Sequence, residues 1–136
     1  MKNKIIAIII GLILVIPISA QSQISLLETE KVNDYLTLNS QQSEKINPII
    51  DQIKTILEED KKILADLKER FNRGDEPGFF EKIGVKRGRD SRSGDIEDLI
   101  DDIEDHLNNE QKIMFKKINK PILNSLSKEE IFGKEE

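Results

Sequence analysis

Apolar residues between Asn39 and Phe71 recur at spacings of three and four. They are Ile46, Ile49, Ile50, Ile53, Ile56, Leu57, Ile63, Leu64, Leu67 and Phe71. This spacing places them on one stripe, so the sequence predicts a single long helix that runs to Phe71. Pro48 falls inside the segment, and a proline in a helix interior costs about 3 kcal/mol. We therefore expect either a kink at Pro48 or a start of the regular helix close to it.

A second helical period begins after Asp95. Its apolar members are Ile96, Leu99, Ile100, Ile103, Leu107, Ile113, Met114, Ile118 and Leu123. Residues 95–111 hold eight acids and no lysine or arginine, whereas residues 112–128 hold five lysines and no acid. Acid first and base last is the order that a helix dipole favours. The pattern predicts a second helix of about 30 residues.

Glycine and serine interrupt the pattern between these helices. Residues 72–94 contain glycines at 74, 78, 84, 88 and 94, a proline at 77 and two serines. This composition predicts a loop, and its length suits a mobile or functional segment. From Arg70 to Gly94 there are seven basic residues and four acidic ones, so the loop is a basic island.

Shorter apolar patterns flank the two long helices. Residues 23–35 predict a short leading helix with Ile24, Leu26, Leu27 and Val32 on its apolar side, and the tail from Ser127 predicts one last turn. The predicted fold is all-α: a long antiparallel helical hairpin with short flanking helices. A hairpin alone cannot cover two apolar stripes. Either the end helices fold back over it, or a second copy packs against it, or apolar surface stays open.

The first twenty residues have the order of a signal peptide. Lys2 and Lys4 precede an apolar run from Ile5 to Ile16, and the small residue Ala20 precedes polar Gln21. The run is shorter than the roughly 20 apolar residues that span a bilayer, so a retained anchor is the weaker alternative. We expect cleavage near Ala20, export to the periplasm, and a single domain over residues 21–136. No cysteine stands beside the cut to carry a lipid, so we expect no stable membrane anchor after cleavage.

Charge and cysteine usage limit the possible partners. Removing residues 1–20 deletes two lysines and no acid, which leaves 19 basic and 26 acidic side chains, a net charge of −7. Nucleic acid is therefore an unexpected partner. An exported domain of this size without cysteines has no disulfide to compensate for a small core, and oligomerisation is the obvious substitute.

Two similar stretches precede apolar-periodic segments. Both read Leu-Asn-x-x-Gln, formed by Leu38, Asn39 and Gln42 in the first copy and by Leu107, Asn108 and Gln111 in the second. The asparagine can accept from an early helical amide while the glutamine reaches back, which is a capping box. A third variant starts at Leu126. Taken singly, each motif is explained as a helix start.

The pair of motifs about 70 residues apart, in an exported helical chain without cysteines, resembles the Spy/CpxP family of periplasmic proteins with its LTxxQ motif. The resemblance covers roughly Leu36 to Leu123, with Asn39 and Asn108 where the family usually has threonine. It implies a long helical hairpin, a cradle-like homodimer, and an ATP-independent chaperone that binds unfolded or damaged envelope proteins under stress. Some family members instead dock on the periplasmic domain of a sensor kinase.

Client binding is expected at the basic island and its neighbours, because interfaces favour mixed aromatic and arginine content. The candidate residues are Arg70, Phe71, Arg73, Phe79, Phe80, Ile83, Lys86, Arg87, Arg89 and Arg92. Phe79 and Phe80 have a second explanation, since they could simply cap the end of the hairpin. Asp60 lies in the apolar stripe and could set a register, line an open cradle surface, or point sideways to water.

Catalysis and metal binding find little support in the sequence. The chain has no cysteine, one histidine and no glycine motif that follows a strand, so we expect neither an enzyme nor a cofactor. His106 lies next to Asp102 and Asp105, so we expect a solvated or ion-paired surface group. Transition-metal sites usually need several His or Cys ligands, so we expect no such site here. Two alternatives to the chaperone hypothesis remain: a regulator that docks on a sensor kinase through the basic island, and a purely structural helical dimer.

Overall fold

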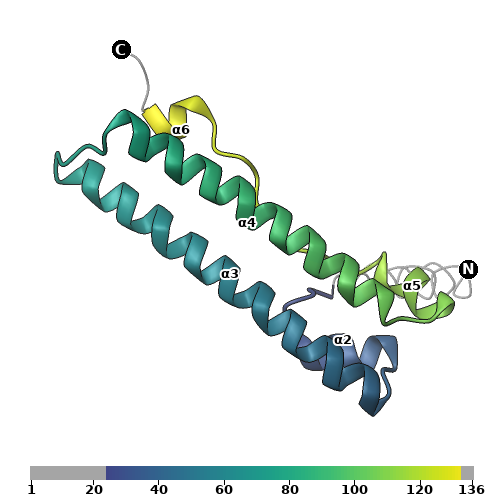
Figure 1. The fold of residues 1–136 in the computed structure, drawn as a ribbon. Coiled ribbons are helices and arrows are strands. Elements are labelled where there is room, and N and C mark those ends of the chain that lie inside the picture. Colours follow the sequence, from purple (N-terminus) through teal and green to yellow (C-terminus); the bar gives the residue numbers. More distant parts are fainter. Residues whose placement is uncertain (1–23, 133–136) are drawn as a thin grey trace, which may run out of the picture.

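The computed structural model describes residues 24–132, which are mainly helical. The elements in chain order are α2 (Thr29–Leu36), α3 (Ser40–Asn72), α4 (Phe79–Asp105), α5 (Asn109–Phe115) and α6 (Lys128–Phe132). Helices α3 and α4 lie side by side as an antiparallel hairpin, with α2 and α5 at one end and α6 at the other (Figure 1). The all-α hairpin prediction is confirmed. The predicted signal peptide lies outside the described residues.

Helix α3 matches the predicted first long helix. It begins at Ser40, eight residues before Pro48, so the regular helix does not start at the proline. Pro48 is exposed and lies inside the helix. The helix ends in a turn where Gly74 adopts a φ of 76°, in the left-handed region that glycine occupies without strain. Residues 73–78, the hairpin tip, then lead into α4.

The predicted loop over residues 72–94 is wrong, because only residues 73–78 are non-helical and α4 already begins at Phe79. Each glycine in a helix interior costs about 1 kcal/mol, but contacts with α3 outweigh this propensity. The helix escaped detection because its inward positions are charged. Lys82 and Arg89 occupy the places where the hydrophobic period requires apolar residues.

Inward-facing residues of both long helices are spaced by seven. They are Ile46, Ile53, Asp60 and Leu67 in α3, and Lys82, Arg89, Ile96 and Ile103 in α4. An ion pair joins Asp60 to Arg89 across the hairpin. Since the helices are antiparallel, this pair places Ile53 of α3 level with Ile96 of α4, seven residues away along each helix. The layer formed by Asp60 and Arg89 therefore sets how the two helices align, with an apolar layer next to it.

The predicted second helix through Leu123 is also wrong. Helix α4 ends at Asp105, the motif at Asn108 starts the separate helix α5, and residues 121–127 are not helical. The acids after Asp95 consequently lie in the C-terminal half of α4, where the helix dipole disfavours them. The interpretation that acids and lysines follow the dipole of one continuous helix is therefore wrong, because that helix does not exist.

The main core lies at the α2 and α5 end of the hairpin. Its fully buried side chains are Leu26, Val32, Leu36, Ile46, Ile50, Ile53, Ile96, Ile103 and Phe115. Backbone hydrogen bonds join Asn119 to Ile24 and Leu26 at 2.8 Å each, which fastens the chain after α5 to the segment before α2. The short elements therefore fold back over the hairpin, which is the first of the three arrangements expected from the sequence.

At the other end, α6 forms the predicted last turn and packs on α4 (Figure 1). The leading helix is shorter than predicted, because residues 24–28 form a bridge and a turn before α2. Some apolar side chains stay exposed even so: Phe79, Phe80, Ile113, Ile122 and Phe132. Within the described range, no helix is long and apolar enough to cross a membrane.

Candidate functional site

Both Leu-Asn-x-x-Gln motifs form the predicted capping boxes. The Asn39 side chain accepts from the Gln42 amide at 2.9 Å, and the Gln42 side chain accepts from the Asn39 amide at 3.1 Å. Asn108 and Gln111 make the same two contacts at 2.9 and 3.0 Å. Each box satisfies amides at the start of its helix, α3 or α5.

The two boxes are also joined to each other, which the sequence did not reveal. The Gln42 side-chain amide donates to Gln111 Oε1 at 2.8 Å, and Gln111 donates in return to Gln42 Oε1 at 3.1 Å. Gln42 also donates to the His106 carbonyl, and the buried Gln111 to the Leu36 carbonyl. The repeated motif thus fastens the start of α3 to the start of α5. A local pattern predicts the caps but contains no signal for their pairing.

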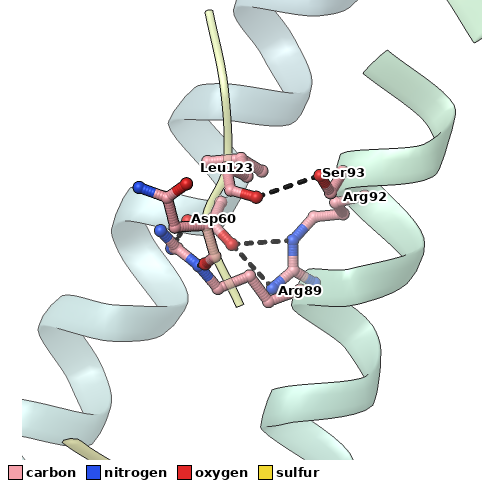
Figure 2. A network of polar contacts seen from close by, with 6 residues as sticks. Asp60, Arg89, Arg92, Ser93 and Leu123 are labelled. Atoms are coloured by element: carbon pink, nitrogen blue, oxygen red, sulfur yellow. Dashed lines mark hydrogen bonds and ion pairs between the residues drawn. The ribbon is translucent and has the colours of Figure 1, made fainter. Parts of the chain in front are cut away.

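The basic island is largely paired within the molecule. Figure 2 shows Asp60 of α3 between Arg89 and Arg92 of α4. Asp60 is only 3% exposed and accepts from Arg89 Nη1 and, at 2.9 Å, from Arg92 Nη2. Of the three explanations offered for Asp60, the inward one that sets the register is correct. Arg89 and Arg92 are therefore turned away from the free surface on which the prediction placed them.

Other cations of the island also have acidic neighbours. Arg70 bonds to Glu81 across the hairpin tip and, at 3.3 Å, to Asp75. The Arg70 guanidinium holds the pKa of the Glu81 carboxyl below its ordinary value, chiefly through this hydrogen bond. Lys86 pairs with Asp90 at 3.0 Å and its hydrogen bond lowers the pKa of that carboxyl. The Arg70 pairs join α3 to the hairpin tip and to α4, whereas the Lys86 pair lies within α4.

The remaining candidates differ in exposure. Arg73 is exposed and lies 3.5 Å from Glu69, and Arg87 is exposed. Ile83 is half-buried. The structure therefore leaves Arg73 and Arg87 as the outward-facing arginines of the predicted set.

Aromatic side chains gather at the hairpin tip. Phe79 is 60% exposed and Phe80 is 86% exposed, and their rings meet edge to face at 5.6 Å. Phe132 of α6 stacks on Phe79 at 5.7 Å. Lys82 Nζ lies over the rings of Phe71 and Phe132 at 5.1 and 5.5 Å. We call Phe71, Phe79, Phe80 and Phe132 the aromatic tip. Phe132 was not among the predicted site residues, because only the fold returns the tail of the chain to the tip.

An apolar depression of about 300 Å³ continues from the aromatic tip along α3. It is lined by Leu64, Leu67, Lys68, Phe71, Asn72, Leu126 and Glu130. We call it the tip groove. Leu126 and Glu130 come from the C-terminal part of the chain, so part of this groove is built by the segment that returns to the tip.

No cluster of three or more His, Asp or Glu side chains suited to a metal ion occurs within residues 24–132. His106, which follows the last residue of α4, has its Nε2 3.7 Å from Asp102, as its place in the sequence suggested. Its main-chain carbonyl is the acceptor for Gln42. The histidine therefore belongs to the junction between the capping boxes.

Comparison with known proteins yielded no match among protein-family profiles, curated proteins or solved structures. The resemblance to the Spy/CpxP family stays a prediction that rests on the two motifs and the predicted export.

Proposed function

We propose that this protein is an ATP-independent, chaperone-like binding protein that holds unfolded envelope proteins in the periplasm, with the aromatic tip as its first contact surface. The observation that supports this proposal is the placement of phenylalanine. Of five phenylalanines in the chain, only Phe115 is in the core, and the other four form the aromatic tip.

Exposed aromatic rings are unfavourable in water, so their concentration at one end of a small domain is typical of an interaction site. Binding by such a surface needs no nucleotide, since burial of the client's apolar side chains itself removes them from aggregation. The exposed Arg73 and Arg87 add positive charge that attracts acidic stretches of a client. The explanation that Phe79 and Phe80 merely cap the hairpin is weakened by their exposure, because a capping ring would be covered.

The regulator hypothesis required the basic island to face an acidic partner. Asp60 holds two of its arginines inward, so the island presents less charge than the sequence suggested. We therefore favour capture of apolar segments over docking on a sensor kinase. A cradle-like homodimer stays part of the proposal, and sedimentation of the purified domain would test it.

The direct test is suppression of aggregation of chemically denatured clients at near-equal molar ratio without ATP. We expect the wild type to suppress aggregation and the double variant Phe79→Ser/Phe80→Ser to lose most of this activity. Ile113→Ser is the matched control, because Ile113 is 63% exposed but belongs to α5, at the opposite end of the hairpin. Absence of suppression by the wild type across several clients, or equal loss in the control, contradicts the proposal.

A further inference from the structure

Residues 121–127 run in an irregular conformation along the hairpin, between the bridge at Asn119 and helix α6 (Figure 1). We call this segment the strap. Side chains of α4 hold it in place: Arg89 Nε donates to the Asn124 carbonyl at 2.6 Å, and Ser93 Oγ donates to the Leu123 carbonyl at 2.9 Å (Figure 2). The strap therefore lies against α4 with two of its carbonyls bound.

Two of the three hydrogen bonds from α4 to the strap are independent of the strap's sequence, and the third runs from Lys86 Nζ to Ser125 Oγ at 2.8 Å. Across residues 120–126 of the described chain, no backbone group takes part in a backbone–backbone hydrogen bond. Both contacts from Arg89 and Ser93 go to main-chain carbonyls, which every residue possesses. Apolar anchoring comes from half-buried Leu123 and from Leu126, which is 8% exposed. An extended segment with two apolar side chains at this spacing offers the same groups apart from the Ser125 hydroxyl.

Asp60 explains why the donors on α4 are ready to bind a chain. Its carboxylate takes three hydrogen bonds from Arg89 and Arg92, so both guanidinium groups are fixed in direction. Arg89 Nε is left facing the strap, where it reaches Asn124. A fixed donor loses little conformational entropy on binding, which favours a site that exchanges one occupant for another.

We propose that the hairpin surface under the strap is a binding site for an extended apolar polypeptide segment, and that the strap is its resident occupant, which a client segment displaces. This inference rests on the proposed function and names the ligand class of the same site. Because α6 follows the strap directly, displacement also lifts Leu126 and Phe132 away from the tip. The α3 side of the tip groove, with Leu64, Leu67 and Phe71, and the rings of Phe79 and Phe80 then form one continuous apolar surface for the client.

Displacement has a measurable consequence for affinity. When only a fraction of molecules has an open site, the apparent Kd equals the intrinsic Kd divided by that fraction. Weakening the strap must tighten client binding, and locking the strap must abolish it. A surface that bound clients without displacement would show neither effect.

The test uses the full chain and two probes: a fluorescent peptide that copies residues 119–132, and a reduced, alkylated and permanently unfolded protein. Leu126→Ala should bind both probes about tenfold more tightly than the wild type, which corresponds to about 1.4 kcal/mol. Ile122→Ala is the matched control, because Ile122 lies in the same strap but is 76% exposed. Its affinity should be unchanged. Far-ultraviolet circular dichroism confirms that each variant keeps its helices.

The locked form uses Lys86→Cys/Ser125→Cys, joined by a short reducible thiol reagent. Lys86 Nζ lies 2.8 Å from Ser125 Oγ, and the chain has no other cysteine. The joined form should bind both probes at least tenfold more weakly, and reduction should restore binding. If joining leaves client binding intact while Phe79→Ser/Phe80→Ser abolishes it, the strap proposal is overturned and the proposed function stands. If no form binds any unfolded protein, the proposed function fails, and the peptide probe alone reports on the site under the strap.

Discussion

The hydrophobic pattern of the sequence and the structure predict opposite effects of Asp60→Asn on the stability of the fold. Because Asp60 lies in an apolar stripe, the pattern predicts that removing its charge stabilises the fold. In the structure, the same change leaves Arg89 and Arg92 without their carboxylate, although both side chains are only 14% exposed. Asparagine keeps the volume, so the effect isolates the charge.

The expected magnitude follows from the burial of the cluster. Removing one partner of a buried ion pair costs about 3–5 kcal/mol. Because the two guanidinium groups retain some contact with water, we take the lower end, about 3 kcal/mol. For a domain of this size each kcal/mol lowers Tm by about 4 °C, so Asp60→Asn should lower Tm by roughly 12 °C.

Thermal unfolding followed by circular dichroism measures this shift. Asp51→Asn is the control, because Asp51 is exposed on the same helix and pairs with Lys54 at 3.6 Å, a surface contact of little weight. The triple variant Asp60→Leu/Arg89→Leu/Arg92→Met should recover most of the stability, since an apolar layer replaces the charged one. A Tm for Asp60→Asn within about 3 °C of the wild type would contradict a buried ion pair at this position, because such a shift corresponds to less than about 1 kcal/mol.

Two further predictions concern the capping boxes and the tip. Gln111→Ala should destabilise the fold by about 1–3 kcal/mol in urea unfolding, because it strips the Leu36 carbonyl of its donor, whereas exposed Gln41→Ala should have little effect. Equal effects would show that the junction contributes nothing. The Glu81 carboxyl, whose pKa is lowered by Arg70, stays ionised in the fold when the unfolded chain takes up a proton. The stability that this pair contributes should therefore be fully present above about pH 4.5 and be lost as the pH drops below it, so acid should destabilise Arg70→Ala less steeply than the wild type. An unchanged slope in that variant would contradict the pairing.

Local patterns predicted the parts of the fold that local forces determine. The stripe from Ile46 to Phe71 predicted α3 to within a residue at its C-terminal end, and the motifs at Asn39 and Asn108 predicted both capping boxes. Each of these depends on residues within four positions of one another, through helix geometry or a single cap. The sequence alone was sufficient for them.

Helix α4 was half missed for a physical reason. Its first half faces α3 with Lys82 and Arg89, whose charges are balanced by Glu76 and Asp60. Periodicity of apolar residues cannot detect a buried face made of ion pairs. Counting positions seven apart from Ile103 and Ile96 would have pointed back to Arg89, and Asp60 holds the same place in the heptad of α3. This seven-residue spacing in both segments is the feature of the sequence that indicates the first half of α4.

The return of the chain to the tip depended on tertiary contacts. Nothing near Asn119 indicates that its backbone binds Ile24 and Leu26, almost a hundred residues earlier. Without that contact the lysine-rich stretch after α5 continues the apparent helix, which is why the strap and Phe132 were absent from the predicted site. Long-range pairing of this kind has no local pattern.

The charged layer at Asp60 divides the hairpin into two halves with different covers. Toward Ile46 and Ile103, the apolar stripes are closed by α2 and α5, which the paired capping boxes hold in place. Toward the tip, the cover is the strap and the five-residue α6, bound by side chains to carbonyls and by few apolar anchors. Local opening occurs where buried apolar contacts and backbone hydrogen bonds are fewest. The half that carries the aromatic tip is therefore also the half that can open without loss of the core, as exchange of the strap for a client segment requires.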